Sequence, residues 1–458
     1  MATVSYGLKI TKENHIFDHT IKFYRDAVNY LVGIALSHYH ELKEIHDSEK
    51  ATVGQLRRQY VEWLVHSTKG NEAAYPYFDQ HFYKMPSYLR RDAITTAIGK
   101  VFAYRKWVEN WERSGKKGHR PFLNRSQDVM PCFYRGNTFK QDGTTAELKL
   151  YDGHDWIWYS VQIRNTDFKY AVNNMSDWKA KAPVLAKRNR RYELRIAYIK
   201  SGKDFPTYVS DSNVESVLGV DLGINSDATC SVLHRDGTVT GQKFINCPVE
   251  KDRMDGLLNT IKKAQQHGSR KNARLWRFVN NYNREIAIKT AQQIVAYADQ
   301  QNVQVIVFEY LKISGKKRGS KKQRLSLWRK RDIQKRVEAM ASRYGIRVSY
   351  ICAVNTSRLA YNGTGRVLRG RDAGFNTYEL CRFQSGKVYN CDLSASKNIG
   401  ARYFIRVLLK SVSAKKLLSV SAKVPELGRR TYCTLATLIN FHAELSANKG
   451  AAQSEKTA

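Results

Sequence analysis

The spacing of apolar residues changes several times along the chain, and each change predicts a different kind of structure. Residues 3–12 alternate between apolar and polar side chains, as a half-buried strand does. From residue 18 to about residue 111 the apolar positions recur with the period of an amphipathic helix. Glycine, proline and charged residues at 114–121 interrupt that pattern, and residues 133–209 carry short strand-like segments. The pattern predicts a β-domain that is interrupted by a helical domain.

The second half of the chain alternates strand and helix patterns. The first three strand patterns read as consecutive antiparallel strands, with an Asp-Gly turn before the third. Helical stretches precede the two later strands, and the residues after Asp392 are helical again. From residue 446 onward we predict disorder. The strands are expected at residues 217–221, 228–234, 239–244, 303–310 and 347–353.

Charge distinguishes this chain more than its length does. Its 458 residues include 77 Lys and Arg against 41 Asp and Glu, a formal net charge of +36. A field of that sign attracts polyanions, so we expect nucleic acid as the main partner. The sequence lacks an apolar run of about 18 residues and a signal-peptide pattern, which predicts no membrane association and no export. Seven scattered cysteines favour a reducing cytoplasm over a disulfide framework.

Three acidic residues stand at the edges of apolar elements. Asp221 and Glu309 each end an apolar strand, and Asp392 precedes the small residues that open a helix. A carboxylate at the edge of a core is costly unless a cation compensates it. Two Mg²⁺ or Mn²⁺ ions about 3.5–4 Å apart need shared oxygen ligands, and such a pair hydrolyses phosphodiesters. We therefore predict that these acids hold two metal ions in a protein that acts on nucleic acid.

Other interpretations of the same acids remain open at this point. Taken singly, Asp221 could be a turn or cap residue, and Glu309 could belong to an ion pair. The Gly-Val-Asp-Leu-Gly segment at 219–223 also fits the phosphate strand of an actin-like or sugar-kinase-like ATPase. The positive charge and the lack of a second glycine-rich phosphate loop favour the nuclease interpretation.

Together, the three segments resemble a known family. Residues 219–225, 305–309 and 392–399 are similar to the three RuvC motifs of TnpB, the transposon-encoded RNA-guided DNA nucleases related to the compact type V CRISPR effectors. The segment 328–350, followed by Thr356 and its neighbours, is similar to the helix, strand and Thr-Ser pair of that family. The resemblance implies a multidomain α+β and α/β protein. It combines an RNase H-like (RuvC) nuclease domain with a β-barrel-like wedge domain that a helical recognition domain interrupts.

The resemblance also implies partners and an activity. The partners would be a guide RNA, transposon-derived or CRISPR-derived, and double-stranded target DNA, and the cofactor Mg²⁺ or Mn²⁺. The protein would be an Mg²⁺-dependent endodeoxyribonuclease of the prokaryotic cytoplasm. Pairing between the guide RNA and the DNA in an R-loop would recognise the target sequence, so the protein would recognise only a short flanking motif in the DNA duplex. A guide-dependent regulator that binds without cleaving, or a guide-independent RNase H-like transposase or resolvase, remains the alternative. A regulator is expected to have lost at least one of the acids, and all three are present.

The same resemblance assigns domains along the chain. In the first half it places a first wedge strand at 1–17, the helical recognition domain at 18–120 and the wedge β-domain at 121–214. The RuvC domain follows at 215–354, with a basic lid loop at 315–324, and the third RuvC motif with its helix lies at 391–410. Between them, at 355–390, is a degenerate zinc-ribbon-like insert for target nucleic acid, and residues 411–458 form a C-terminal extension with a disordered end.

The insert departs from the family pattern. Relatives carry two Cys-x-x-Cys pairs there, whereas this chain has Ala360 and Gly363 in place of the first pair and only Cys381 from the second. We therefore expect no structural Zn²⁺ and a small hairpin-like lid instead. Arg382 stands where relatives often carry an arginine near the cleavage site, so it is a candidate for stabilising phosphate charge, or else a plain surface arginine.

Clusters of Lys and Arg near the acids are candidates for contacts with nucleic acid. One cluster follows Glu309 in a loop that cannot form a core, and the other lies in a basic and aromatic helical stretch. A solvated charged loop and a packing stripe are the competing interpretations. The candidates are Lys316, Lys317, Arg318, Lys321, Lys322 and Arg324 in the loop, and Arg270, Lys271 and Arg274 in the helical stretch.

Overall fold

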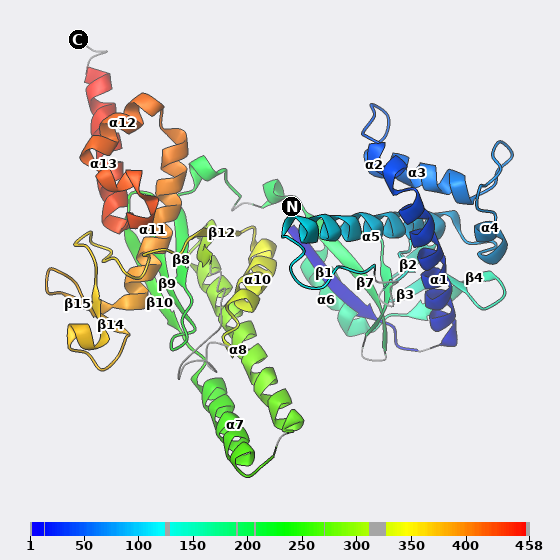
Figure 1. Cartoon of the computed structure of the whole chain (residues 1–458), viewed down its shortest axis with the longest axis horizontal. Helices are drawn as coiled ribbons and strands as arrows, with labels where there is room; N and C mark the ends of the chain where they lie inside the picture. Colours follow the sequence, from blue (N-terminus) through cyan, green and yellow to red (C-terminus); the bar gives the residue numbers. More distant parts are fainter. Residues whose placement is uncertain are drawn as a thin grey trace. The chain divides into compact units, whose positions relative to one another are not determined.

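Two compact units make up the chain, one of residues Thr3–Lys200 and the other of Ser201–Ala458 together with Met1–Ala2. The computed structural model describes residues 2–454 except 13, 124–128, 189–190, 206–207, 270 and 311–326, and leaves undescribed the side chains of 415 and 448–454. In the described part, no helix is long and apolar enough to cross a membrane. Figure 1 labels the elements of both units.

Helices fill the first half of the unit 3–200, as the apolar period predicts. The long helices α1 and α5 pack together, and the buried Tyr24 of α1 donates its hydroxyl hydrogen to Asp92 of α5 at 2.5 Å. Asn14 caps α1 by accepting a hydrogen bond from the backbone of Ile16. The helices are α1 (His15–Ser37), α2 (Tyr39–Glu44), α3 (Val53–Val65), α4 (Tyr77–His81), α5 (Ser87–Arg113) and α6 (Asn165–Met175).

Two open sheets complete this unit. One has the order β1-β7-β5 with β6 also paired to β7, and the other has the order β2-β3-β4. A barrel-like domain was predicted, but no closed barrel forms among the described residues. Only isolated bridges, such as Ile10 with Ile163, extend the sheets, and β5 is two residues long. The strands are β1 (Ala2–Lys9), β2 (Phe139–Asp142), β3 (Thr145–Tyr151), β4 (Trp156–Gln162), β5 (Lys179–Ala180), β6 (Val184–Arg188) and β7 (Arg191–Lys200).

A five-stranded mixed sheet forms the centre of the second unit, with the order β10-β9-β8-β11-β12. Strand β9 is antiparallel to both of its neighbours, β8 and β10, whereas β8, β11 and β12 run parallel. All the strands predicted between residues 217 and 353 are therefore present. Their bounds are β8 (Ser216–Asp221), β9 (Ala228–His234), β10 (Val239–Ile245), β11 (Val305–Tyr310) and β12 (Arg347–Cys352).

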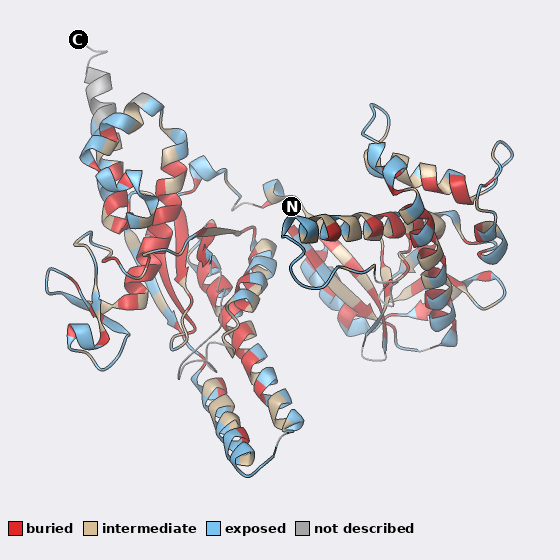
Figure 2. Ribbon diagram, in the orientation of Figure 1, coloured by how far each residue is buried: buried red, intermediate tan, exposed pale blue. Residues whose placement is uncertain are grey.

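Helices cover both faces of this sheet. Alternate residues of β8 and β11 face α8 (Ala273–Gln300) and α10 (Lys330–Ala341) on one side and α11 (Cys391–Ser411) on the other, and α7 (Pro248–Gln266) packs against α8. Because both faces of β8 and β11 are covered, these two strands are almost continuously apolar. The α11 helix is buried along most of its length (Figure 2).

The remaining elements surround α11. A small sheet of β13 (Leu368–Arg369), β14 (Leu380–Arg382) and β15 (Val388–Asn390) precedes it, in the segment where a hairpin-like lid was predicted. After α11 come α12 (Ala414–Lys423) and α13 (Leu435–Ser454). Leu438 and Phe441 anchor the first half of α13 in the core, and the disorder predicted from residue 446 stays a prediction.

Candidate active site

Asp221 and Glu309 lie at the same edge of the central sheet. The parallel ladder between β8 and β11 ends with Val220 opposite Phe308, and each acid is the next residue of its strand. Val217 and Val307 on these strands face α11, and side chains two residues apart point to the same face. Both carboxylates are therefore directed to the side of the sheet on which α11 packs.

Gly219 allows α11 to approach this face closely. A Cβ atom at Gly219 would lie 2.2 Å from the carbonyl oxygen of Ser396 and 2.8 Å from the backbone nitrogen of Gly400. A second contact joins the side chains of Ser231 on β9 and Ser396, whose hydroxyl oxygens are 2.6 Å apart. The backbone of α11 thus lies directly against β8, which fixes the position of its first turn.

Asp392 comes beside Asp221 as a consequence of that contact. Starting from the contact between Gly219 and Ser396, Asp392 lies one helical turn back along α11, a distance of about 6 Å. Asp221 lies two residues further along β8, about 6.6 Å from the same contact. The two acids are therefore at similar distances from it. A Cβ atom at Gly223 would lie 3.6 Å from the Oδ2 atom of Asp392. Asp392 also lies in the first turn of α11, where the helix dipole favours a negative charge.

All three carboxylates have raised pKa values, and burial is the main cause for each. Burial, followed by the charges of Glu309 and Asp392, raises the pKa of Asp221 well above its usual value. Burial also raises the pKa of Glu309 and of Asp392, and the charge of Asp392 adds to the effect on Glu309. Burial of neighbouring carboxylates produces this pattern, which is common at functional sites.

Hydrogen bonds and a nearby positive charge fix the position of Glu309. The hydroxyl of Thr356 donates to its carboxylate, and the charge of Arg402 lowers its pKa against the effect of burial. On α10, the buried Gln334 donates to the backbone carbonyl of Glu309 at 2.9 Å. Glu309 is 8% exposed, whereas Asp221 and Asp392 are half-buried and keep surface that a ligand can reach.

The donor set fits a hard divalent cation. Three carboxylates at one sheet edge supply the oxygen ligands that Mg²⁺ and Mn²⁺ prefer, and a bound cation would offset the burial that raises their pKa values. In the described residues, however, no three His, Cys, Asp or Glu side chains already converge as a metal-binding group. Because uncompensated carboxylates repel each other, the side chains would have to rotate toward a shared ion.

Arg369, which the sequence analysis did not single out, is the arginine next to the acids. Its charge lowers the pKa values of both Asp221 and Asp392 against the stronger effect of burial. One guanidinium nitrogen donates to the carbonyl of Ser357, and its Nε atom is buried without a hydrogen-bond partner among the described residues. A guanidinium with a spare donor beside a carboxylate cluster is suited to an anionic group such as a phosphate.

Arg382 is directed elsewhere. Arg369 pairs with the buried Cys381 across the small sheet, so these two side chains share a face. Arg382 follows Cys381 and points to the opposite face, where its guanidinium lies 5.6 Å from the ring centre of Phe375. The structure therefore does not bring Arg382 together with the three acids.

Glu379 is a further acid that sequence reasoning missed. Its charge raises the pKa of Asp392, and its carboxylate accepts a hydrogen bond from Asn225 at 3.2 Å. Asn225 belongs to the segment that contains Asp221, so Glu379 joins the small sheet to the loop after β8. A fourth carboxylate beside a three-acid cluster had no signal in the sequence, because it is not next to an apolar strand.

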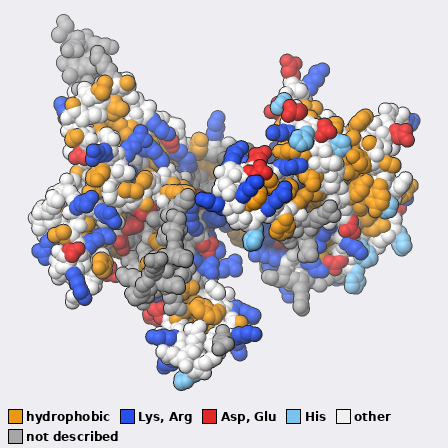
Figure 3. Space-filling view, in the orientation of Figure 1, with side chains coloured by type: hydrophobic (Ala, Val, Ile, Leu, Met, Phe, Trp, Pro, Cys, Tyr) orange, Lys and Arg blue, Asp and Glu red, His pale blue; other side chains and the backbone are white. Residues whose placement is uncertain are grey.

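Only some of the predicted nucleic-acid contacts can be placed. Lys271 precedes α8 and Arg274 lies in its first turn, and both are exposed. Arg270 and all six candidates of the loop after Glu309 lie outside the described residues. Lys and Arg side chains are spread over the visible faces of both units (Figure 3), so the positive charge is not confined to one element.

Two comparisons concern the sequence of the chain. The Aq_aa04 family model matches residues 2–152. A TnpB-like protein, aq_aa05 of Aquifex aeolicus (strain VF5), is 28% identical over 267 residues, which cover 53% of this chain and 84% of the relative.

Solved structures resemble the chain in fold. The Cas12f1–sgRNA–target DNA complex matches with a TM-score of 0.50 and 11% identity, over 84% of this chain and 81% of that protein. The AacC2c1–sgRNA binary complex matches with a TM-score of 0.52 and 10% identity, over 88% and 89%. At such identities the likeness concerns the fold. The predicted resemblance to TnpB-like proteins and compact type V effectors is confirmed.

Proposed function

We propose that this chain, which resembles TnpB-like proteins in sequence and type V effectors in fold, is an RNA-guided DNA endonuclease. The observation that carries the proposal is the group of three carboxylates, Asp221, Glu309 and Asp392, whose pKa values are all raised at one edge of the central sheet. A net charge of +36 around such a group suits a polyanionic substrate.

The chain's own residues would hold and orient the reacting groups. Asp221, Glu309 and Asp392 would bind two Mg²⁺ or Mn²⁺ ions, which supply an activated water and stabilise the leaving 3′ oxygen. Arg369 would bind a non-bridging oxygen of the scissile phosphate, since its buried Nε lacks a partner among the described residues. A donor fixed in place before the reaction lowers the barrier as negative charge develops on the phosphate.

Guide RNA and target DNA are the proposed partners. The structures of Cas12f1 and AacC2c1 that resemble the chain contain sgRNA, and the former also contains target DNA. For this chain we propose the same division of labour, in which guide pairing selects the target and the protein reads a short flanking motif. The exposed Lys271 and Arg274 would contribute phosphate contacts.

Single substitutions of the acids test the activity. We expect the wild-type protein with its guide to cut matched DNA in Mg²⁺, and Asp221→Ala, Glu309→Gln and Asp392→Ala each to bind guide and target but not to cut. If all three variants still cut, the site is wrongly assigned. A wild-type protein that binds guided targets without cutting would instead indicate the regulator.

The RNA that copurifies with the protein tests the guide. We expect RNA from a transposon end or from a CRISPR repeat, and either source supports guided cleavage. Protein that is free of RNA and still cuts DNA would favour a transposase or resolvase.

A further inference from the structure

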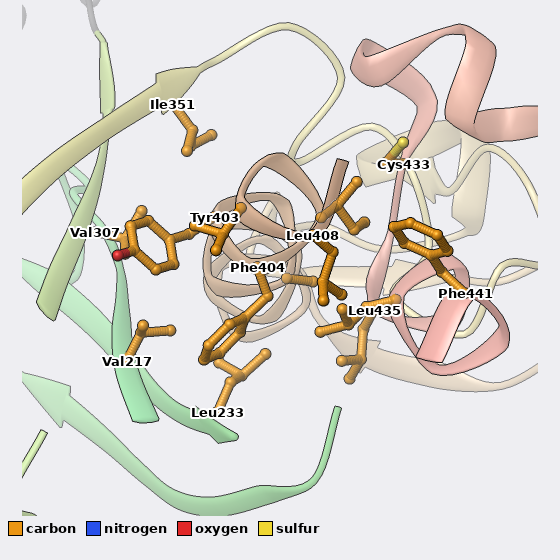
Figure 4. Packing of buried hydrophobic residues seen from close by; sticks show 14 of the residues in the cluster. Val217, Leu233, Val307, Ile351, Tyr403, Phe404, Leu408, Cys433, Leu435 and Phe441 are labelled. Carbon is orange, nitrogen blue, oxygen red and sulfur yellow. The ribbon is translucent and has the colours of Figure 1, made fainter. Parts of the chain in front are cut away.

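The residues after α11 share the core of the nuclease sheet. Val420 and Leu438 of this C-terminal segment, residues 412–447, belong to the same buried cluster as Val217 of β8 and Val307 of β11. Figure 4 shows Tyr403, Phe404 and Leu408 of α11 between the sheet residues and Leu435 and Phe441. The segment is thus part of the nuclease fold, although it follows all three acids in the sequence.

Arg402 of α11 joins this segment to the neighbourhood of Glu309. Arg402 is 6% exposed, and its guanidinium donates to backbone carbonyls on two sides. On the sheet side it donates to Cys352 and Val354 at 3.1 and 2.7 Å, and on the C-terminal side to Thr431 and Cys433 at 2.8 and 2.9 Å. Four carbonyls therefore fix a positive charge within electrostatic reach of the Glu309 carboxylate.

Asn398 provides a second route to the same acid. Its side-chain amide donates to the carbonyls of Thr356 and Leu359, both at 3.0 Å, and its oxygen accepts from the backbone of Leu435 at 3.1 Å. Thr356 in turn contacts Glu309 through its hydroxyl. Asn398 is fully buried and Thr356 is 1% exposed, so water does not substitute for these bonds.

We propose that the C-terminal segment positions Glu309 for metal binding, through Asn398 with Thr356 and through Arg402. This inference rests on the proposed function. Asp221 and Asp392 are set by the contact between β8 and α11, whereas Glu309 has a longer side chain that needs support. The segment supplies that support by fixing both the hydroxyl and the positive charge beside its carboxylate. Asn398, Thr356 and Arg402 are positioning residues that act on the site through Glu309.

Mn²⁺ binding to the RNA-free full-length protein tests this role without measuring cleavage. We expect Asn398→Leu and Thr356→Val to weaken Mn²⁺ binding by about 10–100-fold, the usual effect of losing a group that orients a metal ligand. Thr356→Ser keeps the hydroxyl and should bind nearly as well as the wild type. The matched control is Arg406→Met. Arg406 lies one turn further along α11, and its guanidinium donates to the backbone carbonyl of Tyr350 and to the hydroxyl of Ser349 on β12 instead of bracing the surroundings of Glu309.

Thermal unfolding in a chelator gives an independent test of the link between Arg402 and Glu309. Arg402→Met leaves the buried carboxylate without its counter-charge, so we expect it to lower the Tm more in the wild-type background than in Glu309→Gln. Equal losses in both backgrounds would show that Arg402 does not act on Glu309.

The outcomes separate the inference from the proposed function. Wild-type Mn²⁺ affinity in folded Asn398→Leu and Thr356→Val would overturn the positioning role and leave the metal site intact. A wild-type protein that binds no Mn²⁺ would overturn the metal site, and with it the positioning role. Should Asn398→Leu fail to fold, the Thr356→Val and Thr356→Ser pair decides the result.

Discussion

Gly219 of β8 and Ser396 of α11 are in direct backbone contact, and a Cβ atom at Gly219 would lie 2.2 Å from the Ser396 carbonyl oxygen. Gly219→Ala must therefore push α11 away from the strand. We expect a loss of about 1–3 kcal/mol in the free energy of unfolding, the usual cost of overpacking. Because Asp392 moves with α11, cleavage should fall far more than the loss of stability explains.

Gly256 of α7 provides the control for this substitution. A Cβ atom there would have no neighbour within 4 Å, so Gly256→Ala should stabilise the protein by about 0.5–1 kcal/mol. Denaturant unfolding and single-turnover cleavage of both variants test the pair. Equal cleavage by Gly219→Ala and the wild type would show that the contact does not set the position of Asp392.

Arg369 and Arg382 should differ sharply in their effect on cleavage. Arg369 lies beside the acids with a spare donor, whereas Arg382 lies against Phe375 on the other face of the small sheet. We expect Arg369→Met to slow single-turnover cleavage by about 10²–10³-fold, as loss of a fixed donor to a developing anion does. Arg382→Met should cut at nearly the wild-type rate, and the reverse order would assign the phosphate contact to Arg382.

This difference marks what the sequence can predict. Asp221 and Glu309 each end an apolar strand, so the local pattern of apolar residues predicts their position at the edge of a buried sheet. Arg369 and Arg382 both belong to a polar segment with several arginines, and only the pairing register decides which one shares the face of Cys381. A one-residue change of register reverses that assignment, and residue spacing within the segment does not specify it.

The sequence did not predict the hydrogen bonds that position Glu309, for a related reason. Arg402 and Asn398 lie on a helix that is buried on nearly all sides, so a polar residue there looks like a break in the apolar pattern. Their partners are backbone groups of Thr431, Cys433 and Leu435, and backbone groups carry no sequence signal. The segment was predicted only as an extension because its contribution is made by packing and main-chain bonds.

The stability of the metal-free protein should depend on pH through Asp221. Its pKa in the folded protein is raised well above 3.8, so between these values the folded form binds more protons than the unfolded form. The contribution of Asp221 to stability is therefore fully present in acid and is lost as the pH rises through that window. We expect Asp221→Asn to melt above the wild type at neutral pH in a chelator, with the difference shrinking toward pH 4.

Asp236 provides a control of opposite sign. Backbone and side-chain hydrogen bonds from Thr238 lower the pKa of Asp236 against the effect of burial. Its contribution to stability is present at neutral pH and is lost as the pH falls through its lowered pKa. Asp236→Asn should thus melt at or below the wild type at neutral pH. A lower Tm for Asp221→Asn at neutral pH would contradict the repulsion among the three acids.

Lys271 and Arg274 should contribute to the salt dependence of RNA binding. If both contact phosphates, replacing them with alanine lowers the slope of log K against log salt by about 1.4, since each phosphate contact to a single strand contributes about 0.7. Binding measured at several salt concentrations gives this slope. Lys423→Ala is a suitable control, because Lys423 pairs with Glu444 at 2.8 Å and its loss should leave the slope unchanged.

Mg²⁺ should stabilise the folded protein through the same three acids. A cation that binds only the folded form adds about 2.7 kcal/mol at a concentration 100 times its Kd. It also offsets the burial and the neighbouring negative charges that together raise the pKa of Asp221. We therefore expect Mg²⁺ to raise the Tm of the RNA-free wild type and of Asp236→Asn alike. Asp221→Asn should start from a higher Tm without metal and gain little from Mg²⁺, so the two melting curves should approach each other as Mg²⁺ is added. If Mg²⁺ raised the Tm of all three proteins by the same amount, the ion would bind at a site that does not include Asp221.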